Sequence, residues 1–301
     1  MKNLLLVDIG GTHMRYAISK ENENELSHIN KLSFDTNTID KHLIDIVNEH
    51  RIDVLIISAA GPKIGNTIEM TNRKYSFNSD EIKKRLNLKE CYLINDWESI
   101  AHSYDFIKND IISIKKGEQY NNNNLFLGPG TGLGSALLVN DEVVISTELG
   151  NTKNTISKFE DNYDVSNNSL NVLEDFISGS AISNIYKIKT DIELSSEEIL
   201  KQFLKDDPLS KQIINGFIKS LAETLSDLTL TFLPGRGILL AGSLMRSLYP
   251  ILNNENFISF YLDSNGGIHK KLLEKTSIGV ITKERTPLYG NLAFYNKLNK
   301  S

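Results

Sequence analysis

The sequence predicts an α/β protein, and three of its features lead to that class. An apolar strand, a glycine turn and a return strand occur twice, beginning at Leu4 and again at Leu125. The segments 53–60 and 237–241 are almost entirely apolar, which is typical of strands buried on both faces. Pro208–Phe232 carries apolar residues at the spacing of a long amphipathic helix. With 301 residues, the chain can form two lobes or one large domain.

The composition is that of a globular protein, with 40% hydrophobic and 24% charged residues. The net charge is −5 and no dense Lys/Arg cluster occurs, so we expect no nucleic-acid partner. A single cysteine, Cys91, excludes an internal disulfide and a cysteine-based zinc site, and we expect it to be a buried structural thiol. No signal peptide or membrane span is indicated, so we expect a cytoplasmic protein without a membrane partner. The sequence leaves a homodimer open.

The first strand-turn-strand unit, Leu4–Tyr16, ends its strand at Asp8 and turns at Gly10, Gly11 and Thr12. Glycines allow a ligand to approach the backbone, and free N–H groups in such a turn form a nest for anions. Asp8 stands where it can hold a cation or an ordered water. The alternative interpretation is a plain hairpin with a glycine turn.

The next hundred residues predict alternating strands and helices. We expect strands at 29–34, 53–60 and 91–94, a helix at 39–51, a hairpin turn at Gly65-Asn66, and a second helix that starts and is capped at 79–81 and runs to about Leu86.

The last of these strands delivers Asn95-Asp96 at its carboxyl end. Ligands of open α/β sheets bind outside such ends, so this polar pair is a candidate site. The alternative is that Asp96 only caps a helix at 98–104.

The stretch 108–124 is polar, with a loop at 121–124, and is the best place for a lobe boundary. The second glycine turn, GPGTGLG at 128–134, follows and leads into strands at 135–139 and 142–146. A dinucleotide-binding fingerprint requires G-x-G-x-x-G opening a helix, and neither the spacing nor the following hairpin agrees with it. The Walker lysine motif is also absent from the sequence.

Two acids and a small-residue turn follow. Glu148 lies in a polar segment and could be a solvated surface acid, and Glu174 could be an exposed helical acid. We expect an irregular stretch up to about Asn171. The turn at Gly242 breaks the strand 237–241 and would let an adenine ring lie close to the backbone. The remaining elements that we expect are helices at 178–186, 195–204, 208–232, 244–252 and 287–298, and a strand at 278–281.

Taken in order, these motifs resemble those of the bacterial glucokinase family, the hexokinases of the actin-like ATPase superfamily. DIGGTHMR resembles its first phosphate motif, AAGP and IEMTNRKYSF its first connector and sugar loop, and LINDW its catalytic strand end. GPGTGLG resembles the second phosphate motif, ILLAGSL the adenosine motif and PLYGNLAF the closing connector.

The resemblance implies two ribonuclease-H-like lobes with the active site in a cleft between them. The small lobe would comprise 1–107 and 287–301, and the large lobe 108–286. It also implies Mg²⁺-dependent transfer of the γ-phosphoryl group of ATP to the 6-hydroxyl of glucose.

Residue roles follow from the same resemblance. Asp96 would be the general base, and Asp8 would serve the metal. The residues implied to bind the sugar are Asn72, Asn95, Glu148, Asn151 and Glu174. Those implied to bind ATP are Asp8, Gly10, Gly11, Thr12, Gly130, Thr131, Gly132 and Gly242.

The chain departs from the family pattern at Asn151, where the family has a histidine that contacts sugar. Asparagine donates and accepts hydrogen bonds but lacks the reach and titration of imidazole. His13 stands where the family commonly has asparagine. The alternatives are therefore a kinase for a different hexose or an amino sugar, or a catalytically silent sugar- or nucleotide-binding sensor. The retained Asp96 argues against a sensor, which would have little need for a base.

Overall fold

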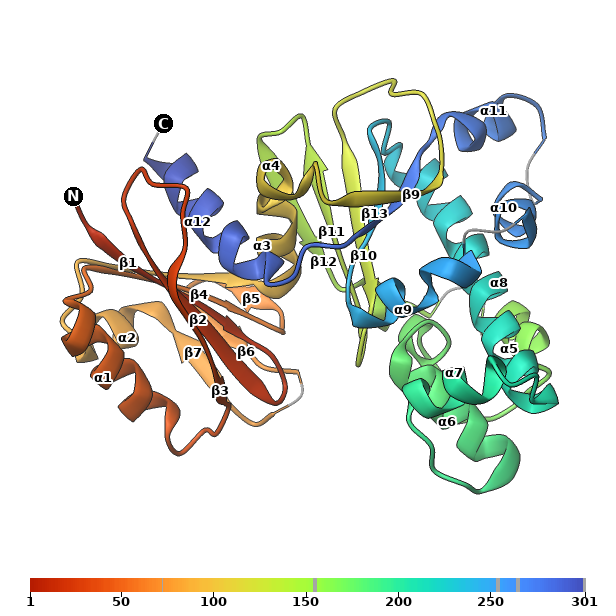
Figure 1. The fold of residues 1–301 in the computed structure, drawn as a ribbon, viewed down its shortest axis with the longest axis horizontal. Helices are drawn as coiled ribbons and strands as arrows, with labels where there is room; N and C mark the ends of the chain where they lie inside the picture. Colours follow the sequence, from red (N-terminus) through yellow and green to blue (C-terminus); the bar gives the residue numbers. More distant parts are fainter. Residues whose placement is uncertain (72, 154–155, 253–254, 264–265, 300–301) are drawn as a thin grey trace. The chain divides into compact units, whose positions relative to one another are not determined.

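The computed structural model describes residues 1–71, 73–153, 156–252, 255–263 and 266–299. The chain forms two compact units (Figure 1). Unit 1 comprises Met1–Asn109 and Lys283–Ser301, and unit 2 comprises Asp110–Thr282. The family resemblance implied lobes that divide after residues 107 and 286, whereas the observed units divide after residues 109 and 282.

Unit 1 is built on a five-stranded sheet of order β3-β2-β1-β4-β8. Its strands are β1 (Asn3–Ile9), β2 (His13–Lys20), β3 (Ser27–Ser33), β4 (Val54–Ala59) and β8 (Glu90–Asn95). β1 pairs antiparallel with β2 and parallel with β4, which pairs parallel with β8. Every residue of β4 is buried because its apolar sequence lies in the interior of the sheet.

Helices complete the core of unit 1. α1 (Ile39–His50) buries Ile39, Leu43, Ile46 and Val47, the four apolar positions of the expected helix. The C-terminal helix α12 (Thr286–Leu298) contacts α3 (Asp96–His102) and β1. The remaining elements are α2 (Ser79–Arg85), α4 (Tyr104–Ile107) and a small sheet of β5 (Lys63–Ile64), β6 (Thr67–Glu69) and β7 (Ser76–Asn78).

Unit 2 is built on a six-stranded sheet of order β12-β11-β10-β13-β14-β9. The strands are β9 (Ile111–Lys115), β10 (Asn124–Pro129), β11 (Leu133–Val139), β12 (Val143–Thr147), β13 (Gly237–Leu240) and β14 (Ile278–Ile281). The antiparallel hairpin β10–β11 next to the parallel pair β10–β13 repeats the arrangement of β2, β1 and β4 in unit 1.

The helices of unit 2 pack mainly around α8 (Pro208–Phe232), which has the bounds that the sequence predicts. The others are α5 (Ile156–Tyr163), α6 (Gly179–Thr190), α7 (Ser196–Phe203), α9 (Ser243–Leu252), α10 (Glu255–Leu262) and α11 (Gly267–Lys275). Two short 3₁₀ helices carry the candidate acids. Glu148 directly precedes η1 (Leu149–Asn151), and Glu174 is the central residue of η2 (Leu173–Asp175).

The structure corrects four local expectations. The polar stretch 108–124 contains β9, and the stretch expected to be irregular up to Asn171 contains α5. Asn78, and not a residue of 79–81, caps α2 through bonds to two backbone N–H groups. Cys91 is partly exposed, although desolvation raises the pKa of its thiol to about 12.

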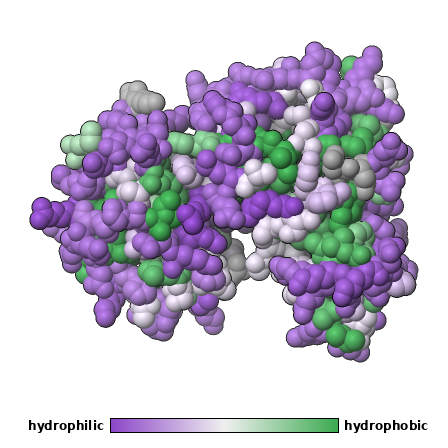
Figure 2. All heavy atoms as spheres, viewed as in Figure 1, coloured by the Kyte–Doolittle hydropathy of each residue, from purple (hydrophilic) through white to green (hydrophobic). Residues whose placement is uncertain are grey.

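On the face shown in Figure 2, hydrophilic residues cover most of the surface of each unit. Within the part of the chain that the structure describes, no helix is long and apolar enough to cross a bilayer.

Candidate active site

The first glycine turn joins β1 to β2 in unit 1 and is closed from within. The N–H of Gly10 donates to the carbonyl of His13 (3.0 Å), and the carbonyl of Thr12 accepts from the N–H of Phe34 (3.0 Å). Among the described residues, the N–H groups of Gly11 and Thr12 have no hydrogen-bond partner. Two consecutive open amides in a glycine turn form a nest that fits a phosphate oxygen.

Asp8 lies at the end of β1, directly before this turn, and is 6% exposed. Its Oδ2 accepts a hydrogen bond from Nη1 of Arg15 (3.1 Å). Burial raises the pKa of Asp8, and the adjacent guanidinium opposes that rise. Mg²⁺ is commonly held by one or two carboxylates together with substrate phosphates, so a lone carboxylate beside a phosphate nest fits that ion.

Asn95 and Asp96 lie where β8 passes into α3. The side-chain oxygen of Asn95 caps α3 by accepting from the N–H groups of Trp97 (2.9 Å) and Glu98 (3.3 Å). The helix cap is therefore Asn95, and the interpretation of Asp96 as the cap is wrong. Nδ2 of Asn95 donates to the carbonyl of Gly61 (3.0 Å), which leaves one amide N–H for a ligand. Asp96 is half-buried at the first position of the helix.

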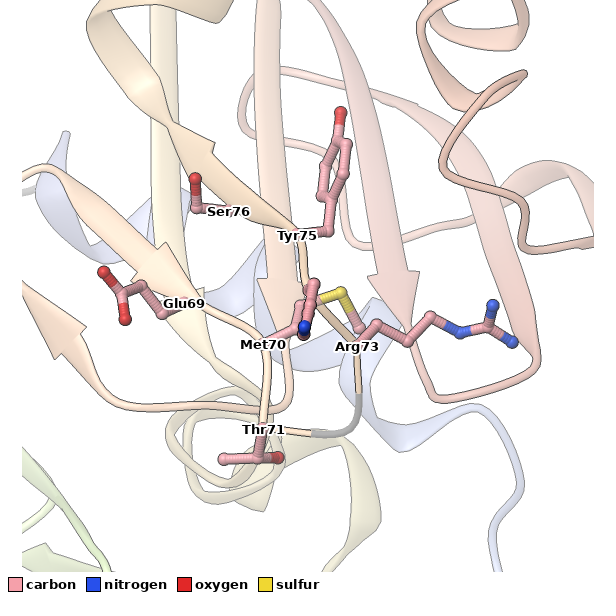
Figure 3. A pocket seen from close by; sticks show the side chains of 7 residues that line it. Glu69, Met70, Thr71, Arg73, Tyr75 and Ser76 are labelled. Carbon is pink, nitrogen blue, oxygen red and sulfur yellow. The ribbon is translucent and has the colours of Figure 1, made fainter.

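Asn72 lies outside the described residues. The connection between β6 and β7 on either side of it lines a pocket of about 820 Å³ (Figure 3). Glu69, Thr71, Arg73 and Tyr75 are among the residues that line it. The expected sugar loop therefore borders a pocket lined by both polar and apolar side chains.

The second glycine turn joins β10 to β11 in unit 2 and is also closed from within. The N–H of Gly130 donates to the carbonyl of Gly132 (2.8 Å), and the carbonyl of Gly130 accepts from the N–H of Gly179 (2.7 Å) at the start of α6. Among the described residues, the N–H groups of Thr131 and Gly132 are unpartnered. Each unit therefore offers one turn with two consecutive open amides.

Glu174 lies against this second turn. Its Oε2 accepts from the N–H of Leu133 (3.1 Å) and occupies the space that a Cβ at Gly132 or Gly150 would fill, at 2.6 and 2.9 Å. The interpretation of Glu174 as an exposed helical acid is therefore wrong. A side chain at position 132 would displace this carboxylate, and one at position 150 would also meet the backbone carbonyl oxygen of Leu133 at 2.6 Å, which only glycine avoids.

Glu148 and Asn151 lie at the two ends of one short helical turn. Nδ2 of Asn151 donates to Oε2 of Glu148 at 3.5 Å, a long contact. Desolvation raises the pKa of Glu148, the Asn151 contact lowers it, and repulsion from Glu174 raises it further. The three sugar-binding candidates of unit 2 thus lie in one polar cluster, although Glu148 itself is exposed.

Gly242, the expected adenosine-site glycine, lies between β13 and α9 with a φ of +106°. A Cβ there would lie 3.8 Å from the carbonyl of Pro129, the residue before the second turn. The backbone conformation favours glycine and brings this connection next to the turn.

Sequence reasoning missed two sets of residues that hold these parts in place. Arg73 contacts the first turn, and Ser99 and Asn291 form a buried network. Nδ2 of Asn291 donates to the carbonyl of Val7 (2.8 Å), and the hydroxyl of Ser99 donates to Oδ1 of Asn291 (2.8 Å). This network connects the strand of Asp8 to the helix of Asp96. Asn291, a polar residue within an otherwise apolar helical motif, was the available signal.

The fold is that of sugar kinases with the actin-like ATPase architecture. A glucokinase from an Antarctic psychrotroph superposes with a TM-score of 0.79 at 22% identity, covering all of both chains. A ROK-family glucokinase from Streptomyces griseus, solved in complex with glucose and AMPPNP, superposes with a TM-score of 0.70 at 16% identity, covering 97% of this chain and 98% of the other.

The sequence comparison gives the family. The Glucokinase family model matches residues 5–298. A glucokinase from Mesorhizobium japonicum is 26% identical over 313 residues, covering 97% of this chain and 91% of the relative. The chain belongs to the glucokinase family and is an ATP-dependent sugar kinase.

Proposed function

We propose that this protein transfers the γ-phosphoryl group of ATP to the 6-hydroxyl of glucose, with Asp96 as the general base. The observation that carries the proposal is that two adjacent residues at the end of β8 have different roles. Asn95 takes over the capping of α3, so that the carboxylate of Asp96 is not required as its cap.

Asp96 accepts the proton of the sugar hydroxyl as its oxygen attacks the γ-phosphorus and the bond to ADP breaks. A carboxylate at the end of a strand can orient the alcohol for in-line attack, and orientation supplies much of the rate in phosphoryl transfer. The remaining amide N–H of Asn95 donates to a neighbouring sugar hydroxyl.

The glycine turns hold the nucleotide. The open amides of Gly11, Thr12, Thr131 and Gly132 donate to phosphate oxygens, and the connection at Gly242 accommodates the adenosine. Asp8 holds Mg²⁺, directly or through water. When bound, that ion neutralises charge on the phosphates.

Glu148, Asn151 and Glu174 accept hydrogen bonds from sugar hydroxyls, together with Asn72. Charged acceptors strengthen such bonds. A second candidate substrate, another hexose or an amino sugar, is favoured by Asn151. Its amide contacts Glu148, and the family carries a histidine at that position.

The experiment is a panel of sugars, assayed with purified protein, Mg²⁺ and ATP by release of ADP. Glucose, mannose, glucosamine and N-acetylated amino sugars form the panel. We expect the highest kcat/KM with glucose. A higher value with another sugar would replace glucose as the substrate, and no turnover with any of them would favour the sensor.

A further inference from the structure

The two glycine turns differ in how they are held from outside. In unit 2 a backbone group performs this task, because the N–H of Gly179 donates to the carbonyl of Gly130 (2.7 Å). In unit 1 a side chain performs it, because Nε of Arg73 donates to the carbonyl of Gly11 (2.7 Å). Arg73 lies 62 residues from Gly11 in sequence, in the connection between β6 and β7.

This contact sets the direction of an amide in the nest. The carbonyl of Gly11 and the N–H of Thr12 belong to one planar trans peptide group, so they point in opposite directions. With the carbonyl held by Arg73, the N–H of Thr12 points away from it, on the side open to a ligand. Loss of the contact would free this peptide group to rotate.

Neighbouring residues fix the Arg73 side chain. Its guanidinium carbon lies 5.4 Å from the centroid of the Phe34 ring, and the N–H of Phe34 donates to the carbonyl of Thr12. The connection itself is closed by the N–H of Met70, which donates to the carbonyl of Tyr75 (3.0 Å). Figure 3 shows Arg73 extending away from Thr71 and Ser76.

Among the described residues no carboxylate lies within ion-pair distance of Arg73, whereas Arg15 on β2 is paired with Asp8. The Arg73 side chain is exposed and contacts the turn through Nε. Its positive charge beside the turn favours an anionic ligand there.

We propose that Arg73 is a positioning residue for ATP: it holds the first glycine turn in its phosphate-binding form, so that the open N–H groups of Gly11 and Thr12 face the nucleotide phosphates. This inference rests on the proposed function and adds to it a residue that none of the glycine motifs contains.

The test is calorimetric titration with AMPPNP and Mg²⁺ of the wild-type protein, Arg73→Gln, Arg73→Lys and Lys74→Gln. Lys74 is the matched control, an exposed cation next in sequence that also lines the pocket. We expect Arg73→Gln to weaken AMPPNP binding by about tenfold, since a charge-assisted hydrogen bond is lost. Arg73→Lys should give an intermediate loss because ammonium lacks the planar fork, and Lys74→Gln should stay within about twofold.

Sugar binding, measured by the same method, and the melting temperature should be unchanged in Arg73→Gln. Equal AMPPNP affinity in Arg73→Gln and wild type would overturn the inference alone. So would an equal loss in Lys74→Gln, or a parallel loss of sugar binding and melting temperature. A wild-type protein that binds no AMPPNP would overturn the proposed function together with the inference.

Discussion

At the scale of single residues, Glu174 links the proposed sugar site to the second glycine turn. It is a sugar-binding candidate, yet its carboxylate accepts a hydrogen bond from Leu133 at the end of the second glycine turn. A change at this residue should therefore affect both the sugar and the nucleotide.

We expect Glu174→Gln to raise the KM for sugar by about tenfold and the KM for ATP by a smaller factor. Hydrogen bonds to a charged acceptor contribute about 1.5 to 3 kcal/mol, and the neutral amide makes weaker ones. Steady-state kinetics with each substrate varied in turn measure both values. Glu197→Gln, at an exposed acid whose partner is the adjacent Ser196, is the control. An unchanged KM for sugar would remove Glu174 from the sugar site.

His102, on α3, makes the stability of the fold depend on pH. Desolvation, together with the charge of Lys297, lowers the pKa of this buried imidazole from 6.5 to about 4. The unfolded chain therefore binds more protons than the folded chain between these values. The contribution of His102 to stability is therefore complete above about pH 6.5 and is lost as the pH drops towards 4.

Between pH 7 and 4.5 this group should remove about 2 to 3 kcal/mol of unfolding free energy, from the pKa shift and 1.36 kcal/mol per unit. His102→Gln should lose correspondingly less over the same range. Urea unfolding of both proteins at the two pH values measures the difference, with Glu98 and Lys297 retained in both. Parallel pH profiles would show that His102 titrates normally in the fold.

At the scale of elements, the crossing of α12 over α3 sets the position of Asp96. A Cβ at Gly290 would lie 1.7 Å from the carbonyl oxygen of Ser99, so only glycine allows this approach. The hydroxyl oxygen of Ser99 also lies 2.6 Å from the carbonyl oxygen of Pro287, which shares the single hydroxyl proton with Oδ1 of Asn291. The two helices are thus joined one turn away from the proposed base.

Gly290→Ala should destabilise the protein by about 1 to 3 kcal/mol, as overpacking does, and should lower kcat because α3 must move. Thermal unfolding and steady-state kinetics test the two effects. Gly266→Ala is the control: a Cβ there meets nothing within 4 Å, and its only expected cost is at the N-cap of α11, so kcat should not change. If Gly290→Ala retains wild-type stability and kcat, the close crossing has no role in placing the base.

Elements with strong local signals could be predicted from the sequence. α1 and α8 have clear apolar periodicity, and both glycine turns are local motifs. β9 was missed because its apolar residues stand among lysines and asparagines. α5 was missed because it lies in a polar segment; the side chains described as buried there are those of Phe159 and Tyr163. Its helical form depends on packing against α8.

In the candidate site, too, some residues have a local sequence signal and others do not. The residues of the glycine turns, Asp96 and the two acids could be named from short motifs and the family resemblance. Arg73 and Asn291 could not, because their partners lie 62 and 284 residues away in the chain. The polar Asn291 in an otherwise apolar helix signals that a buried partner exists, but the identity of that partner is set only in the folded chain.

At the scale of the whole molecule, unit 1 is completed by the end of the chain. Leu288, Leu292 and Tyr295 of α12 share one buried cluster with residues of β1 and β4. Unit 2 has a separate core built from its own residues. Loss of the C-terminal helix should therefore damage one unit and spare the other.

A variant that ends at Thr282 tests this expectation. The single tryptophan, Trp97, reports on unit 1, and its emission should shift to longer wavelength in the absence of denaturant. The helical circular dichroism of unit 2 should persist and be lost in a cooperative transition. Native emission from Trp97 in this variant would show that unit 1 does not need α12.

The most direct test of the account as a whole compares wild type with Asp96→Asn in two measurements, ATP-dependent phosphorylation of glucose and calorimetric binding of glucose. Asp105→Asn, at an exposed acid paired with Lys108, is the control. General-base catalysis contributes about 10² to 10⁴ in rate, so we expect Asp96→Asn to lower kcat by about a thousandfold while glucose affinity stays within about threefold. Turnover at the wild-type rate in Asp96→Asn would contradict the assignment of the base and the mechanism built on it.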